Sequence, residues 1–231
     1  MLLTKPRALL KNVYGLTIDH DDDELIAWEL RGIGSLGLGL AIQVYASIVQ
    51  GIAPITAMGL GLIPRALFYL YTTFSGKMKS LNIQTRFFTM NTVMTCWCVA
   101  SLLLGLGKPS TTSKIYSSMC FLKSLFFTWA PRTSCKKLLG RPCEGQALGL
   151  MRGAGNELFV SSLLMLSAAW ASNIVSPVAA AGYVCVAWVV LLADMAMLAK
   201  TWQLMGFSNA RTNWVNLIMA AVLGTGFLLA K

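Results

Sequence analysis

Residues 32–71 contain a single charged residue, Arg65. A helix that crosses a bilayer needs about 20 predominantly apolar residues, so this stretch is long enough for two crossings. Pro54 divides it, and proline is disfavoured inside a helix but well suited to its first turn. The sequence therefore predicts membrane-spanning helices at about 32–51 and 54–74.

Four further apolar segments follow, at about 87–106, 155–174, 177–199 and 212–230. The composition agrees with a membrane location, because 56% of the residues are hydrophobic and only 12% are charged. A soluble domain has about 25% charged residues. We therefore predict an all-α integral membrane protein with about six transmembrane helices.

Landmarks recur in order along the two halves of the chain, which predicts two three-helix repeats. The segment Arg31-Gly32-x-Gly34 corresponds to Arg152-Gly153-x-Gly155, Pro54 corresponds to Pro177, and Asn91 corresponds to Asn216. The predicted organisation is a polar N-terminal tail (1–30), a first repeat (31–106), a basic linker (107–152) and a second repeat (153–231).

The linker contains an apolar stretch with Lys123 in its middle. Its apolar residues recur at helical spacing between polar ones, which favours a helix lying in the membrane interface, and a spanning helix is the alternative. Repeats joined by a linker on one side would be inverted, and those joined by a crossing linker would be parallel. The acid-poor linker side is expected to face the cytoplasm, stroma or matrix.

Two charged residues are expected at membrane depth, where a charge is costly and usually pairs or faces the protein interior. Arg65 lies in the second predicted helix and Asp194 in the fifth. They could line a path for an ion or a solute. We instead expect them to fix helix register, by pairing with each other or by Arg65 binding a lipid, cofactor or partner carbonyl.

Asn91 and Asn216 occupy corresponding places in the third and sixth predicted helices, and Gln43 lies in the first. An amide within the membrane can hydrogen-bond between helices, or it can ligate the magnesium of a chlorophyll, a hard cation that accepts oxygen ligands. Glycines allow helix backbones to approach closely. Those expected to do so are Gly32, Gly34, Gly59, Gly155 and Gly182.

No catalytic or nucleotide-binding motif is present, so we expect no enzyme and no NAD. The chain has one histidine and six cysteines without a C-x-x-C pair, which argues against haem and zinc, and we expect no metal site. The net charge of +10 is typical of membrane-protein loops near anionic headgroups. We expect no nucleic-acid partner.

These observations predict a non-catalytic accessory subunit that scaffolds a large organellar membrane complex. The preferred complex is a photosystem with its light-harvesting antenna in the chloroplast thylakoid, with chlorophyll, carotenoid and lipid as ligands and other subunits as partners. A mitochondrial respiratory or ATP-synthase accessory subunit of the inner membrane is one alternative. A small-solute transporter or channel is the other, and it would be favoured if the intramembrane charges and the two asparagines met in one cavity.

Overall fold

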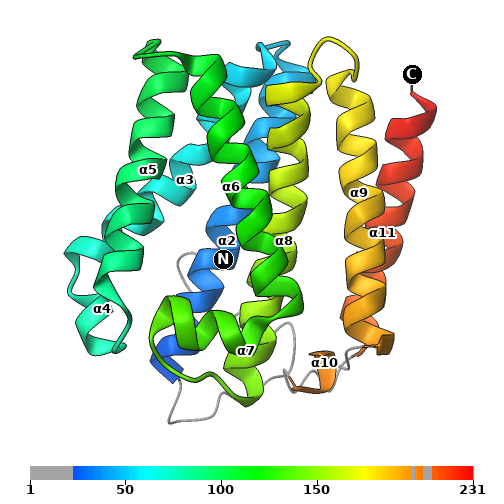
Figure 1. Ribbon diagram of the computed structural model, residues 1–231. Coiled ribbons are helices and arrows are strands. Elements are labelled where there is room, and N and C mark those ends of the chain that lie inside the picture. The colour runs from blue at the N-terminus through cyan, green and yellow to red at the C-terminus, as the bar shows by residue number, and fades with distance from the viewer. Residues whose placement is uncertain (1–22, 199–200, 205–209, 231) are drawn as a thin grey trace.

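The computed structural model describes residues 23–198, 201–204 and 210–230. Every regular element in this part of the chain is helical (Figure 1). The long helices are α2 (Asp23–Val44), α3 (Pro54–Phe74), α5 (Thr85–Leu104), α6 (Pro109–Trp129), α8 (Gly145–Trp170), α9 (Pro177–Ala193) and α11 (Ala210–Leu229). The short elements are α4 (Lys77–Ser80), α7 (Pro131–Ser134), α10 (Thr201–Leu204) and the π-helical turns η2 (Tyr45–Val49), η3 (Cys135–Leu139) and η4 (Asp194–Leu198).

Local sequence signals explain where several helices begin and end. Proline occupies the first turn of α3, α6 and α9, where its missing N–H costs nothing. Before α9, the Ser176 side chain accepts a hydrogen bond from the Ala179 N–H at 3.2 Å, as an N-cap does. Gly105 ends α5 with φ +71°, a left-handed conformation that favours glycine.

Each of the six predicted segments contains a long helix, and four helical stretches are long and apolar enough to cross a membrane. These stretches are Glu24–Val49, Pro54–Phe74, Thr85–Leu104 and Pro177–Ala196. The bounds differ most for α2, which begins at Asp23 and not near residue 32, and for α8, which begins at Gly145 and not near residue 155. The extra turns of α8 are held in the helix because Ala147, Leu148 and Met151 are buried in a hydrophobic cluster with η3.

α6 stands upright in the bundle, packed along α8 (Figure 1), and does not lie across its end as the predicted interfacial helix would. Its small and polar face points inward: Ser113, Tyr116, Ser117, Cys120, Ser124 and Thr128 are buried. Its apolar face points outward: Ile115, Met119, Leu122, Phe126 and Trp129 are exposed. The sequence revealed the amphipathic pattern but not which face is buried, and the predicted linker 107–152 is therefore part of the helical bundle.

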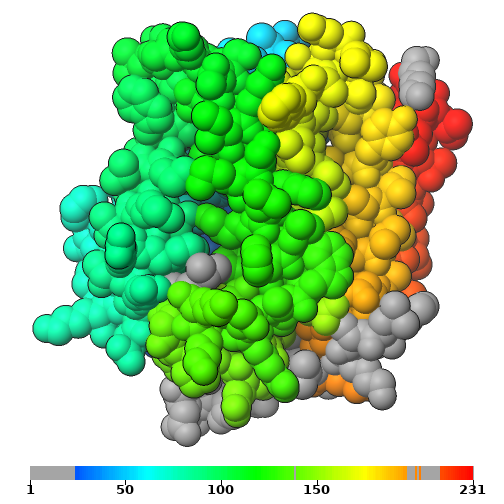
Figure 2. Space-filling model, in the orientation of Figure 1, coloured from blue at the N-terminus to red at the C-terminus, as the bar shows by residue number. Residues whose placement is uncertain are grey.

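Five helices close into a ring in the order α2, α3, α5, α6, α8, because each packs against the next and α8 packs against α2. α9 packs against α8 outside this ring, and α11 packs against α9. α5 and α6 form much of the face seen in Figure 2, and α9 and α11 extend the molecule to one side. Each half thus has a central helix, α3 or α9, between two others.

The short helices α4, α7 and α10 all lie at one end of the bundle, which we call the loop-helix end (Figure 1). α2 and α8 both run away from this end, and α3, α6 and α9 return toward it. With α6 upright, the two three-helix groups have the same direction. If they are repeats, they are parallel ones.

Candidate functional site

A cavity of about 80 Å³ lies within the five-helix ring, which is room for several water molecules. All five ring helices contribute to its lining, together with η3. Most of the lining is aromatic or aliphatic. The charged side chains that reach it are Glu29, Arg65 and Lys123.

Arg65 is the central polar residue of this cavity and is only 4% exposed. Its Nη1 donates to the Tyr116 hydroxyl at 3.5 Å and to Cys120 Sγ at 3.3 Å. The Tyr116 hydroxyl in turn lies 2.8 Å from Thr95 Oγ1. No described residue accepts a hydrogen bond from the Arg65 Nε or forms an ion pair with the guanidinium. The positive charge is therefore buried with neutral neighbours.

Lys123 brings a second cation to the same cavity from α6. Its Nζ donates to the Asn91 side-chain oxygen and lies 5.3 Å from the centre of the Phe87 ring. The Asn91 amide nitrogen donates to the Phe87 carbonyl at 2.7 Å. Asn91 is therefore an interhelical polar contact between α5 and α6, and Lys123 occupies the oxygen that could have ligated a pigment.

The charge of the lining does not balance. Glu29, on α2, is 4% exposed and supplies one carboxylate, whereas Arg65 and Lys123 supply two cations. With all three ionised, the described lining has a formal charge of +1. Buried charges are costly unless they are compensated, so the cavity favours an additional negative charge.

Helix direction explains why residues far apart in the sequence meet here. Arg65 and Lys123 precede the ends of α3 and α6, whereas Asn91 follows the start of α5. All three helix termini lie at the loop-helix end (Figure 1). At 1.5 Å rise per residue, the three residues lie at about 9–14 Å from that end. The alternation of helix direction therefore places them at one level.

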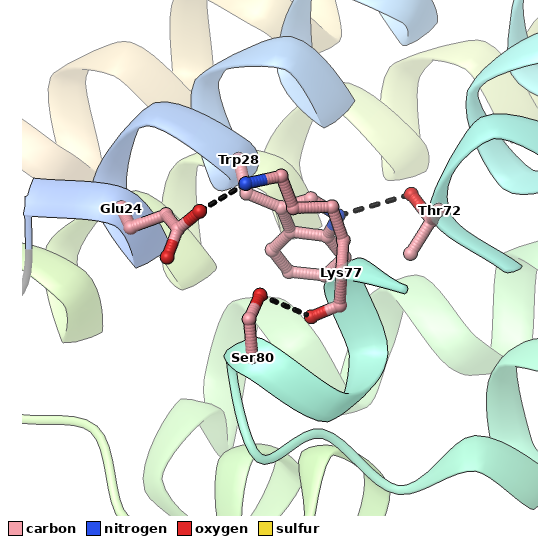
Figure 3. A network of polar contacts seen from close by, with 5 residues as sticks. All are labelled: Glu24, Trp28, Thr72, Lys77 and Ser80. Atoms are coloured by element: carbon pink, nitrogen blue, oxygen red, sulfur yellow. Dashed lines mark hydrogen bonds and ion pairs between the residues drawn. The ribbon is translucent and has the colours of Figure 1, made fainter. Parts of the chain in front are cut away.

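Contacts near the loop-helix end hold the wall of the cavity in place (Figure 3). Trp28, which lines the cavity, donates its ring N–H to Thr72 Oγ1 at 3.0 Å. Lys77 forms an ion pair with Glu24. These contacts join the start of α2 to the end of α3 and to α4, so that the Trp28 ring has a defined position.

Asp194 lies elsewhere and does not pair with Arg65, which corrects the pairing considered from the sequence. Its Oδ2 accepts a hydrogen bond from Arg152 Nη2 at 2.5 Å, and both side chains are partly buried. The pair joins α8 to η4. The π-helical turn begins at Asp194 itself, and such turns are frequent at positions under functional or packing constraint.

Neither of the other two predicted amides lines this cavity or bonds to a described residue that does. Asn216 has an exposed side chain on α11, so it differs from its predicted counterpart Asn91, which is buried. Gln43 is buried between α2 and α3, where its Cβ is 2.9 Å from the position of a Cβ atom at Gly61. Of the predicted polar residues, Asn91 is therefore linked to the cavity of Arg65 through Lys123, and Gln43 lines a smaller neighbouring pocket together with Arg65.

The predicted glycines differ in how closely they are packed. A Cβ atom at Gly155 would lie 2.5 Å from the backbone nitrogen of Thr128, and at Gly59 or Gly182 it would lie 2.8 Å from a leucine side chain. At Gly32 the nearest atom would be 3.3 Å away, on Phe68. Gly34 is buried. The close contact of α6 with α8 depends on Gly155.

Lys123, Glu29 and Arg152 are polar residues of the interior that sequence reasoning did not select. The sequence contains an indication that Lys123 is special, because this lysine interrupts an apolar stretch. A lysine on an interfacial helix can reach water, so the predicted interfacial helix gives no reason to place Lys123 in the interior. Glu29 fell within the predicted polar tail.

The described residues hold no group of three or more His, Cys, Asp or Glu side chains arranged to bind a metal ion, and the six cysteines are free thiols. No protein-family model, curated protein or solved structure matches this chain. The site must therefore be interpreted from its own chemistry.

Proposed function

We propose that this chain is a polytopic membrane protein that carries a small anionic solute across the bilayer through its five-helix ring. The meeting of both charges and both asparagines that the sequence analysis required of a transporter does not occur, because Asp194 pairs with Arg152 and Asn216 is exposed. The observation that supports the carrier function is instead the convergence of Arg65 and Lys123 on one cavity with a single carboxylate, Glu29, in its described lining. A cation at the centre of a membrane helix costs about 2.5–3.5 kcal/mol on insertion scales. Such residues typically mark the path of an ion or a substrate.

The outer surface supports the membrane location. Large apolar side chains are exposed on several helices, such as Leu67 (60%), Val190 (62%) and Val222 (64%). α6 has its polar face inside and its apolar face outside, the reverse of a helix on the surface of a soluble protein. An apolar outer surface and a polar inner face are the arrangement expected of a protein surrounded by lipid.

The basic residues support one orientation. The three connections at the end opposite the loop helices, residues 50–53, 105–108 and 171–176, contain one charged residue, Lys108. The basic residues near the loop-helix end are Lys77, Lys79, Arg86, Arg132, Lys136, Lys137 and Arg141, and the nearby described acids are Asp23, Glu24 and Glu144. Loops rich in Lys and Arg remain on the cytoplasmic side, so the loop-helix end would face the cytoplasm or its organellar equivalent.

The accessory-subunit function predicted from the sequence is the second candidate. The observation that favours it is α11, which packs against α9 at the side of the molecule and exposes apolar residues such as Ile218 and Met219. A neighbouring subunit could cover this face. Pigments, carotenoid or lipid would then bind on the outside of the bundle, in a thylakoid or mitochondrial complex.

Anion flux into proteoliposomes tests the carrier function. The purified full-length chain is reconstituted, and uptake is measured for a panel of chloride, nitrate, acetate, butyrate and phosphate. We expect uptake of at least one anion above protein-free vesicles, and a loss of at least about tenfold in Arg65→Gln because the intramembrane cation attracts the solute.

Lys114→Gln is the matched control, because Lys114 is on the same helix as Lys123 but stacks on the Trp170 ring at 4.8 Å, outside the cavity. Its flux should equal that of the wild type. Uptake of every anion at the rate of protein-free vesicles would contradict the carrier function. Co-migration of the chain with a large particle in mild detergent would then favour the accessory subunit.

A further inference from the structure

We propose that the cavity binds small monocarboxylates, with the carboxylate held side-on by the Nε and Nη2 atoms of Arg65. The inference deepens the proposed carrier function by naming its substrate class. It is argued from the donors that Arg65 leaves unused, the charge of the lining and the character of the walls.

The guanidinium of Arg65 uses one of its three nitrogens in hydrogen bonds to described residues. Nη1 is engaged by Tyr116 and Cys120, and the fully buried Nε lacks an acceptor among the described residues. No hydrogen bond joins Nη2 to a described residue. These two N–H groups form the edge of the guanidinium that receives two carboxylate oxygens in a bidentate pair. Because burial of an unsatisfied donor costs about 1–3 kcal/mol, a ligand that supplies both acceptors is favoured.

The charge of the lining selects the ionisation state of the ligand. Arg65 and Lys123 against Glu29 give +1, so a bound monocarboxylate makes the described lining neutral. A phosphate monoester, at about −1.5 to −2 near neutral pH, would leave excess negative charge among buried side chains. A neutral amide of the same shape would leave the guanidinium uncompensated.

The walls of the cavity determine what can be attached to the carboxylate of the ligand. Around Arg65 stand aromatic side chains, among them Phe68, Phe88 and Phe127. These suit a short hydrocarbon tail. The volume of about 80 Å³ limits the ligand to a few heavy atoms, such as butyrate.

Equilibrium binding to the full chain in nanodiscs tests the inference, with butyrate as the probe and butyramide and inorganic phosphate as comparison ligands. We expect saturable binding of butyrate only. Arg65→Lys keeps the charge but removes the side-on pair of donors, and should weaken butyrate binding about tenfold or more. Arg132→Gln removes a charge from the exposed surface of α7 and should leave it unchanged.

Several outcomes would overturn the assignment. They are equal binding of butyramide, tighter binding of phosphate, or equal losses of affinity in Arg65→Lys and Arg132→Gln. If an Arg65 variant does not fold, as shown by size exclusion, the comparison of butyrate with butyramide on the wild type decides. Butyrate binding without flux would refute the carrier function and retain the site, whereas flux of inorganic anions without butyrate binding would do the reverse.

Discussion

At the scale of single residues, glycine determines how closely two helices can approach. α6 and α8 meet at Gly155, where an added Cβ atom would lie 2.5 Å from Thr128 N and 2.6 Å from the Phe127 carbonyl carbon. Backbone atoms cannot move aside as the end of a flexible side chain can. The same argument applies to Gly39 and Gly61, each of which faces the other's carbonyl oxygen.

Gly155→Ala should therefore destabilise the protein by about 1–3 kcal/mol, the usual cost of overpacking. Gly226→Ala is the control, because an added Cβ there meets nothing within 4 Å and alanine favours a helix. The measurement is the thermal unfolding midpoint of each variant in one detergent. Equal midpoints for the two variants would show that α6 and α8 are not in close contact at Gly155.

At the scale of elements, α6 shows that a hydrophobic pattern does not determine which face of a helix is buried. Its apolar residues at helical spacing were visible in the sequence, but the pattern is the same whether the apolar face meets lipid headgroups, a protein core or the bilayer interior. The structure turns Ser117 inward, where it is fully buried, and Leu122 outward, where it is 57% exposed. Lys123 then reaches the ring cavity and not water.

Substitutions on the two faces of α6 should have opposite consequences to those in a soluble amphipathic helix. Ser117→Leu adds volume to a buried contact and should lower stability by about 1–3 kcal/mol. Leu122→Ala should change it by less than about 0.5 kcal/mol, as surface substitutions do. Thermal unfolding in detergent micelles compares the two. A larger loss in Leu122→Ala than in Ser117→Leu would mean that the apolar face is the buried one.

At the scale of the whole molecule, the upright position of α6 changes the predicted topology. With the linker on one side, its basic residues and those of residues 75–86 would lie on opposite sides of the membrane. If α6 crosses the membrane, Lys79 of α4 and Lys136 of η3 lie on the same side, and the opposite connections retain Lys108 alone. The basic residues of the connections are then concentrated at the loop-helix end.

Single cysteines placed at Lys79, Lys108 and Lys136, in a variant whose native cysteines are replaced by alanine, test this topology. In sealed vesicles of one orientation, a membrane-impermeant maleimide should label positions 79 and 136 together and position 108 only from the other side. The reason is that α6 separates residue 108 from residue 136. Labelling of positions 108 and 136 from one side would return α6 to the interface and make the repeats inverted.

The sequence by itself determined the approximate positions of the long helices, although not the starts of α2 and α8, because apolar runs, first-turn prolines and helix-ending glycines act within a few residues. It also marked Arg65 as a buried charge and Gly155 as a close contact. Only the tertiary structure decided that Asp194 pairs with Arg152 and that Lys123 joins Arg65 at one cavity. Those relations depend on the direction and order of helices far apart in the chain, and local hydropathy does not encode them.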